Sequence, residues 1–409
     1  MTDLLAGVRV LDLTTILAGP FAAYQLSLLG ADVIKIEIPD GGDPARELGS
    51  ENPQHVPEFG ASFVAQNCGK RSMAIDLKSE GGREVFARLI AESDVLLENM
   101  RPGVLARLGF APERIRQLNP LLVYCAVSGF GQSGPIAGRP AYDQIIQGLA
   151  GMIEVTGFPD AEPVRAGFPV ADTLGGFAAA MSICAALAQR DARGTGCFLD
   201  VSMLETALSA MGWAVSDYLV GGLPAQRRGN ENATSSPSGT FRTGAGRLNI
   251  AANAQAQFEV LCRVCGCEHL IDDARFLTRG DRKKHRRALS AELERYLAGR
   301  PAAEWEELLS AAGVPAGRVL SVEESLAQPQ IAERRLVHSV TLPSSERTVR
   351  VLGSGVHVDD HELAPSSPPP RLGEHTDEIL GDLGYSESDI EELRAEWALG
   401  PARKRSAGV

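Results

Sequence analysis

The chain has 409 residues, of which 44% are hydrophobic and 22% are charged, and its formal net charge at pH 7 is −12. This length predicts about two to three domains, and the composition is that of a globular protein with a sizeable core, which excludes the disordered and collagen-like classes. An acidic chain has the wrong sign for a general nucleic-acid binder, so we expect no nucleic-acid partner.

The sequence offers no evident membrane or export signal. No stretch approaches the ~20 uninterrupted apolar residues that span a bilayer. The N-terminal segment carries Asp3 and no basic region before an apolar one, unlike a secretory signal. We therefore expect no membrane partner, a cytoplasmic location and seven reduced cysteines.

In chain order, the first half alternates between short apolar runs and helical patterns. Pro20 suits the first turn of a helix and Gly30 ends it. A strand, a helix and a strand within ~30 residues form a βαβ unit, and the pattern recurs. Strands are predicted at 8–13, 33–37, 95–98 and 121–127, and helices at 21–29 and 81–92. The first half therefore predicts a doubly wound, Rossmann-like α/β domain.

Leu174–Gln189 is an almost wholly apolar helix, which we expect to be buried on all sides. A strand at 198–201 and a helix at 204–220 follow it. The polar stretch Arg227–Gly239 then predicts a long loop or a crossing between domains.

The rest of the chain predicts a smaller α+β domain and a return to the larger one. The smaller domain has a hairpin around Thr243–Gly246, and its helices are predicted at 257–265, 287–297 and 303–312. β-like segments at 337–342 and 350–356 and an acidic helix at 387–397 follow. We expect the large domain in 1–220, the small domain with its linkers in 221–330, and the return in 331–409.

Cys262, Cys265, Cys267 and His269 lie close together in the sequence, but their spacing lacks the second distant pair of a structural zinc module. They also continue the apolar pattern of a helix. We therefore predict small buried side chains and no metal site.

Asp172 stands at the entry of the most apolar helix and has two interpretations. On spacing alone it is an N-cap that accepts hydrogen bonds from the first free amides. The other interpretation is a desolvated carboxylate that acts as a nucleophile or an acid/base, beside small residues that let a ligand approach. The two roles are compatible.

Basic residues before and after the third strand are candidates for phosphate binding, because ligands of doubly wound sheets bind at strand ends. They are Lys70, Arg71, Lys78, Arg101 and Arg107. Solvation would explain any one of them alone. A Gly-rich loop, Ser128–Pro135, follows a strand at its carboxyl end, and it is either a ligand loop or a tight turn.

Several common catalytic motifs are missing. The first βα turn has no G-x-G-x-x-G, Gly69–Ser72 has no partner glycine for a P-loop, and there is no G-x-S-x-G elbow. Nicotinamide chemistry, nucleotide hydrolysis and a hydrolase triad therefore lose support.

Taken together, the motifs resemble the family III CoA-transferases, which include formyl-CoA transferase and carnitine CoA-transferase. The α-methylacyl-CoA racemases share this fold. The segments that carry the resemblance are 10–12, 18–20, 30–37, 70–78, 98–103, 128–131, 139–143, 312–317 and 372–376.

This resemblance implies a catalytic aspartate at Asp172. It places CoA contacts at Leu17, Ala18, Ile75, Lys78, Asn99 and Arg107, and we add Arg101 and Tyr142 as candidates. It also implies an interlocked homodimer, whose active site lies between the large domain of one chain and the small domain of the other. Coenzyme A is then a co-substrate, and we expect no tightly bound cofactor and no metal.

Two positions depart from the family pattern. Ile38 stands where formyl-CoA transferase has an arginine, and Gly229–Gly239, where members carry a mobile stretch over the site, is not a run of glycines.

The implied reaction transfers CoA from an acyl-CoA to a carboxylic acid through an aspartyl mixed anhydride and an aspartyl-CoA thioester. Succinyl-CoA or another dicarboxylyl-CoA is the favoured donor. Amides near Gly175–Gly176 or in the polar loop are candidates to hold the oxyanions.

Two alternatives remain. A 2-methylacyl-CoA racemase needs a base on each face of the α-carbon, yet no histidine stands between His55 and His269. A non-catalytic CoA-binding protein would keep the basic groups and tolerate the loss of Asp172.

Overall fold

The computed structural model describes residues 3–49, 55–343, 345–396 and 398–399, which form two compact units. The larger unit takes its described residues from 1–152, 165–223 and 330–409, and the smaller from 153–164 and 224–329. The segment 153–164, which the sequence prediction left in the large domain, belongs to the smaller unit. There the Gly229 amide donates to the Gly157 carbonyl at 2.8 Å, and Arg227 pairs with Glu154 at 2.9 Å.

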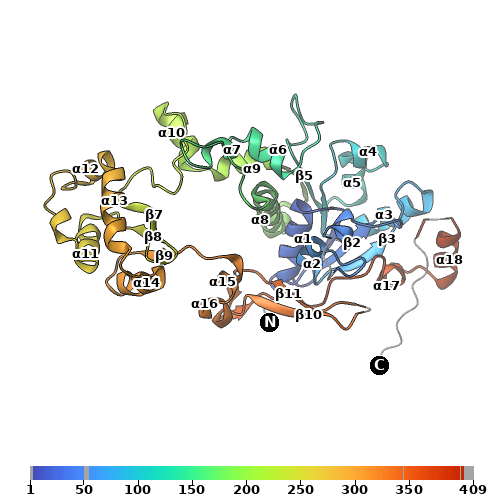
Figure 1. The fold of residues 1–409 in the computed structure, drawn as a ribbon. Helices are drawn as coiled ribbons and strands as arrows, with labels where there is room; N and C mark the ends of the chain where they lie inside the picture. Colours follow the sequence, from blue (N-terminus) through green and yellow to red (C-terminus); the bar gives the residue numbers. More distant parts are fainter. Residues whose placement is uncertain (1–2, 50–54, 344, 397, 400–409) are drawn as a thin grey trace. The chain divides into compact units, whose positions relative to one another are not determined.

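A six-stranded sheet forms the centre of the larger unit (Figure 1). In spatial order its strands are β3 (Arg71–Ala74), β2 (Asp32–Glu37), β1 (Arg9–Asp12), β4 (Val95–Glu98), β5 (Val123–Ser128) and β6 (Cys197–Ser202). Every neighbouring pair is parallel. The order runs outward in both directions from β1 and β4, so the topological switch point, where doubly wound sheets bind ligands, lies between these two strands.

Both faces of this sheet are covered, because successive side chains of each strand point to opposite faces. Val10 belongs to the core under α1 and α8, and the next residue, Leu11, to the core under α3 and α5. The helices of this unit are α1 (Ala18–Leu28), α2 (Ala61–Asn67), α3 (Glu80–Ala91), α4 (Val104–Arg107), α5 (Pro112–Leu118), α6 (Asp143–Leu149), α8 (Val170–Arg193), α9 (Met203–Ala210) and α10 (Trp213–Gly221), with a 3₁₀ turn at Pro44–Glu47. A further short helix, α7 (Met152–Val155), lies at the boundary with the smaller unit.

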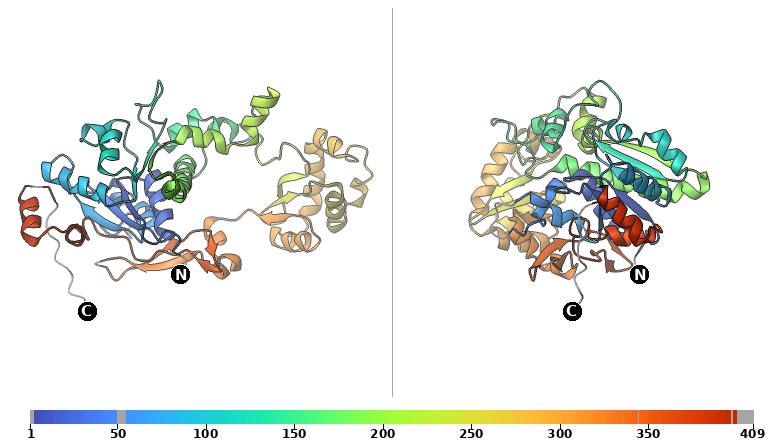
Figure 2. Two further views of the ribbon diagram at one scale, coloured as in Figure 1. Left: turned by 180° about the vertical axis from the view of Figure 1, so that it is seen from behind. Right: turned by 90° about the vertical axis from the view of Figure 1, so that its right-hand side faces the viewer.

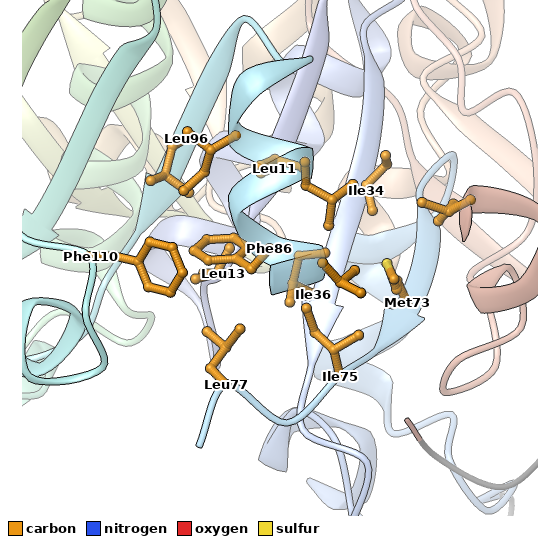
Figure 3. Close-up of a cluster of buried hydrophobic side chains, with 14 of the residues drawn as sticks. Leu11, Leu13, Ile34, Ile36, Met73, Ile75, Leu77, Phe86, Leu96 and Phe110 are labelled. Carbon is orange, nitrogen blue, oxygen red and sulfur yellow. The ribbon is translucent and has the colours of Figure 1, made fainter. Parts of the chain in front are cut away.

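The core under α3 and α5 is densely apolar (Figure 3). Leu11, Ile34 and Leu96, from three adjacent strands, are at most 1% exposed. The rings of Phe86 and Phe110 meet edge to face with centroids 4.7 Å apart, an arrangement that aromatic quadrupoles favour. This packing fixes the strands whose carboxyl ends carry the site.

The C-terminal segment returns to the β3 edge of the sheet (Figure 2). Its helices are α16 (Pro329–Glu333), α17 (Thr376–Asp382) and α18 (Glu387–Ala395), and its strands pair as the hairpins β10 (Val337–Thr341) with β11 (Thr348–Leu352) and β12 (His357–Val358) with β13 (His361–Glu362). The Asp76 amide donates to the Ala398 carbonyl at 2.9 Å, and Ile75 forms an isolated bridge with Leu399. Residues far apart in sequence thus complete one unit.

The smaller unit has its own three-stranded antiparallel sheet and its own core. The strands, in spatial order, are β7 (Ser238–Arg242), β8 (Arg247–Ala251) and β9 (Ala316–Arg318), and the helices are α11 (Gln255–Cys265), α12 (Arg279–Lys284), α13 (Arg286–Leu297), α14 (Ala302–Ala311) and α15 (Val322–Leu326), with a 3₁₀ turn at Glu268–Leu270. Cys262, Cys265 and Cys267 are buried in this core. Within the described parts of the chain, no group of three or more His, Cys, Asp or Glu side chains is arranged to hold a metal ion.

Helix α8 differs from its prediction, because it is not buried on all sides. Gly175, Gly176 and the alanines Ala171, Ala179 and Ala180 face the core, while Phe177 and Met181 are 52% and 69% exposed. The small residues set the contact: a Cβ at Gly176 would lie 2.6 Å from the Ala18 carbonyl oxygen, so only glycine lets α8 approach α1 this closely. By length and composition alone α8 could cross a membrane, a property that core helices of globular proteins share.

Candidate active site

A cavity of about 240 Å³ opens at the switch point of the large sheet. Its walls come from the segments that follow β1, β4 and β5, together with the first turn of α8 and residues 137–142. These five segments, which are separate in sequence, therefore meet at the place where a doubly wound sheet binds its ligand.

Asp172 lies in this cavity at the third position of α8, and its carboxylate does not cap the helix. The cap comes from Asp143, whose Oδ1 accepts hydrogen bonds from the amides of Ala171 at 2.8 Å and Asp172 at 3.4 Å. Gln147 donates to the other oxygen of Asp143 at 2.6 Å. The capping interpretation of Asp172 is therefore wrong, and its carboxylate is free for another role.

The surroundings of Asp172 oppose its ionisation. Burial raises the pKa of Asp172 to about 7, and the nearby negative charge of Asp143 adds to the effect. Among the described residues, none donates a hydrogen bond to the Asp172 carboxylate or forms an ion pair with it. Perturbed carboxylates in clefts are typical of functional sites.

The turn after β1 forms another wall, and side chains hold its backbone throughout. The Thr14 amide donates to Asp12 at 3.0 Å, and the Thr14 carbonyl accepts from Lys35 Nζ at 2.8 Å. Asn99 brackets Thr15: its Oδ1 accepts from the amide at 3.0 Å and its Nδ2 donates to the carbonyl at 2.8 Å.

The next residue of this turn, Ile16, has a φ of +70°. A β-branched residue rarely adopts this left-handed conformation, which needs support from its surroundings. Asp43 supplies that support, because its Oδ1 accepts from the Ile16 amide at 3.1 Å. The turn then delivers Leu17 and Ala18 to the cavity wall.

Fully buried ion pairs lie beneath this turn. Lys35 pairs with Asp43 at 2.9 Å, and Lys70 pairs with Asp12 at 2.8 Å. Although burial alone would raise the pKa of Asp12, the charges of Lys70 and Lys35 hold that pKa below its usual value.

Two of the predicted phosphate-binding side chains are therefore engaged elsewhere. Lys70 is buried against Asp12, and Arg71 binds Asp32 at 2.6 Å and Glu378 at 3.1 Å. The phosphate prediction is wrong for both, because carboxylates of the protein already bind them. These carboxylates lie tens to hundreds of residues away in the sequence and are not evident from the local pattern.

The cavity gathers six of the nine predicted site residues: Asp172, Leu17, Ala18, Asn99, Arg101 and Tyr142. The Tyr142 side chain is 72% exposed, and the Asn99 amide is occupied by Thr15.

Three predicted residues do not line the cavity. Ile75 is buried in the core under α3, so its side chain cannot reach a ligand. Lys78 and Arg107 are exposed elsewhere on the large unit. Their proposed contacts to CoA remain predictions. Ile38, at the position where the family pattern has an arginine, is exposed as well.

The amides of Gly175 and Gly176 are not free, contrary to the oxyanion prediction. Both residues lie beyond the first turn of α8, where amides bond to carbonyls four residues earlier. Two polar cavity residues, Ser128 at the end of β5 and Arg139, were not among the predicted site residues. Two features of the sequence could have indicated them: Ser128 is the first residue of the Gly-rich loop, and Arg139 begins the segment 139–143 that carries part of the family resemblance.

Comparison with known proteins agrees with the family resemblance seen in the sequence. The model of the family described as CoA-transferase family III matches residues 5–376. The chain belongs to the family III CoA-transferases. This confirms the resemblance stated from the sequence and the assignment as a CoA-transferase.

Curated relatives of this CoA-transferase match it over most of its length. Succinyl-CoA:glutarate CoA-transferase from Mus musculus is 35% identical over 390 residues, which cover 95% of this chain and 88% of the mouse protein. Acetyl-CoA:oxalate CoA-transferase from Acetobacter aceti is 38% identical over 364 residues, covering 88% and 92%. The structure of a CAIB/BAIF family protein from Brucella suis matches with a TM-score of 0.83 at 34% identity and covers 94% of this chain and 100% of that one. The predicted α/β fold with a parallel sheet is thus confirmed.

Proposed function

We propose that this CoA-transferase moves CoA between dicarboxylic acids by acylation of Asp172. The observation that carries the proposal is the state of that carboxylate: it lies in the switch-point cavity, poorly hydrated, with no cation or hydrogen-bond donor from the described residues. Such a carboxylate is less stabilised than one in water, which makes it a better nucleophile once ionised.

The reaction needs no redox step. An Asp172 oxygen attacks the thioester carbonyl, a C–O bond forms, the C–S bond breaks, and CoA thiolate leaves a mixed anhydride. The thiolate then attacks the Asp172 carbonyl carbon and releases the first acid, which leaves an aspartyl-CoA thioester. The acceptor carboxylate attacks this thioester, and the two steps run in reverse to release the new acyl-CoA and the Asp172 carboxylate.

The charge at the cavity suits anionic substrates. Arg101 and Arg139 both line it and are exposed, and neither forms an ion pair with a described carboxylate. Arginine is well suited to bind carboxylate and phosphate groups. An acidic protein therefore presents two uncompensated cations where a second carboxylate, or part of CoA, would lie.

The names of relatives support the dicarboxylate class. The mouse relative is named for succinyl-CoA and glutarate, and a relative from Agrobacterium fabrum, 36% identical over 398 residues, is named a succinate–glutarate CoA-transferase. We infer succinyl-CoA as a donor and a C4–C5 dicarboxylate as the acceptor.

We also propose that the enzyme works as an interlocked homodimer, as the family resemblance implies. Exposed apolar side chains of the large unit support a protein interface: Phe177 and Met181 on α8, and Trp213, Leu219 and Val220 on α10. Exposed apolar surface of this kind is typical of interaction sites.

The test is a transfer assay with succinyl-CoA and glutarate, in which glutaryl-CoA is quantified. We expect Asp172→Asn to lower kcat by at least about 10³-fold, because the amide cannot form the anhydride. Asp191→Asn is the matched control: the same substitution on the same helix, at an exposed residue away from the cavity, should leave the rate unchanged. Undiminished transfer by Asp172→Asn would contradict the proposal. So would exchange of the α-proton of a 2-methylacyl-CoA without an acceptor acid, which indicates a racemase.

A further inference from the structure

Ser128 is a buried side chain whose hydroxyl has no use within the protein. It is the last residue of β5, it is 8% exposed, and it lines the same cavity as Asp172. Across the part of the chain that the structure describes, Ser128 Oγ has no hydrogen-bond partner.

A buried hydroxyl without a hydrogen-bond partner lowers the stability of the folded protein. A buried hydroxyl without a partner loses its hydrogen bonds to water and gains nothing in return, so native structures rarely keep one without a reason. An alanine would fill almost the same volume without the penalty. A ligand that satisfies the hydroxyl is a physical reason for a serine at this position.

The position of Ser128 indicates which ligand group that is. The cavity holds the carboxylate that attacks the thioester, so the oxygen of the attacked carbonyl must lie in the same small space. Serine has three staggered χ1 rotamers, which lets its hydroxyl turn toward an incoming acceptor. The carbonyl oxygen gains negative charge as the C–O bond forms and therefore needs a donor.

No other donor is evident in the first turn of α8. Asp143 accepts the Ala171 and Asp172 amides, and the Thr173 amide bonds to the Pro169 carbonyl at 3.1 Å. The glycine amides belong to the helix. In the wall formed by the end of β5 and the first turn of α8, the Ser128 hydroxyl is therefore a donor that remains available for this task.

We propose that Ser128 is a catalytic residue of the CoA transfer, whose hydroxyl donates a hydrogen bond to the acyl carbonyl oxygen as Asp172 attacks. The hydrogen bond forms and breaks without a net proton transfer: Ser128 keeps its proton, and the oxygen returns to a carbonyl when the C–S bond breaks. The inference rests on the proposed function.

The experiment compares Ser128→Ala with Ser93→Ala. Ser93 is also buried, 5% exposed, with an Oγ that lacks a partner, but it precedes β4 at the opposite end from the cavity-forming loop. Each variant is assayed for transfer from succinyl-CoA to glutarate and for thermal unfolding. Single-turnover labelling of Asp172 by succinyl-CoA is followed in parallel.

We expect Ser128→Ala to lower kcat by about 10²-fold with KM within about threefold, because the lost hydrogen bond is strongest in the transition state. Its unfolding temperature should equal or exceed that of the unsubstituted enzyme, since a buried unsatisfied hydroxyl is removed. Ser93→Ala should keep full activity. Lower activity in a variant that is no less stable distinguishes a catalytic role from a structural one.

A kcat for Ser128→Ala within twofold of the unsubstituted enzyme, or a change in KM alone, would overturn the inference. Labelling separates this failure from that of the proposed function. If Asp172 is labelled in the unsubstituted enzyme and equally fast in Ser128→Ala, only the role of Ser128 fails. If Asp172 is not labelled at all, the proposed function fails.

Discussion

Two walls of the cavity differ in how their polar groups are hydrogen-bonded. One wall is the turn after β1, and the other is formed by the end of β5 and the start of α8. In the turn, the amides and carbonyls of Thr14 and Thr15 and the amide of Ile16 all have side-chain partners. In the other wall, the Asp172 carboxylate and the Ser128 hydroxyl have none among the described residues.

We infer from this difference that the turn has a structural role, whereas the other wall carries the proposed chemistry. Buried charges at the turn hold a strained backbone in one conformation, which keeps the wall in place as substrates exchange. The carboxylate and the hydroxyl are left unsatisfied at a cost to stability, and in the proposed reaction the carboxylate attacks the substrate while the hydroxyl donates to it. The two walls should therefore respond oppositely to substitution.

The largest loss of stability is expected from a substitution at the turn after β1. Asp43→Ala leaves Lys35 charged and unpaired in the interior and removes the acceptor of the Ile16 amide. We expect a loss of about 3–5 kcal/mol in the free energy of unfolding, measured by urea denaturation.

The control for this prediction is a surface pair. Glu84→Gln breaks the exposed Arg88–Glu84 contact and should change stability by less than about 0.5 kcal/mol. If Asp43→Ala is as mild as this control, the buried pair does not support the turn and the contrast between the walls is lost.

Substitution of Asp172 is expected to change the free energy of unfolding by a smaller amount and in the opposite direction, toward greater stability. Because the folded-state pKa of Asp172 is raised to about 7, the native protein binds more protons than the unfolded chain between pH 4 and 7. The stability of the unsubstituted enzyme should fall over this range as pH rises. Asp172→Asn has no such titration and should be more stable by about 2 kcal/mol at pH 8, with little difference near pH 4.

The measurement is urea denaturation of both proteins at pH 4, 6 and 8. A difference that does not grow with pH would mean that the Asp172 carboxylate is hydrated or paired, and the two walls would not differ in the way described.

Much of the fold follows from local sequence. The predicted strand at 95–98 matches β4 residue for residue, and the hairpin around Thr243–Gly246 joins β7 to β8, because apolar period and turn residues act over a few positions. The exposed face of α8 was not predictable in the same way. Apolar composition predicts burial but does not say whether the chain itself provides the cover.

The sequence could single out an individual residue of the site by its position. It could not predict side chains whose role depends on partners from distant parts of the chain. Asp172 was singled out from its position at the entry of an apolar helix, and the structure places it in the switch-point cavity, while its catalytic role stays a prediction. Lys70 and Arg71 were misassigned because their carboxylate partners come from β1, β2 and α17. Ser128 was missed because a lack of hydrogen-bond partners is a property of three-dimensional surroundings, which sequence spacing does not encode.

The central claim is that Asp172 becomes covalently modified during turnover. The direct measurement is to mix the enzyme with succinyl-CoA, quench with hydroxylamine and map the peptides by mass spectrometry. We predict a hydroxamate at Asp172 that requires the acyl-CoA and is absent from Asp172→Asn. An unmodified Asp172 peptide in an enzyme that turns over under the same conditions would contradict the account.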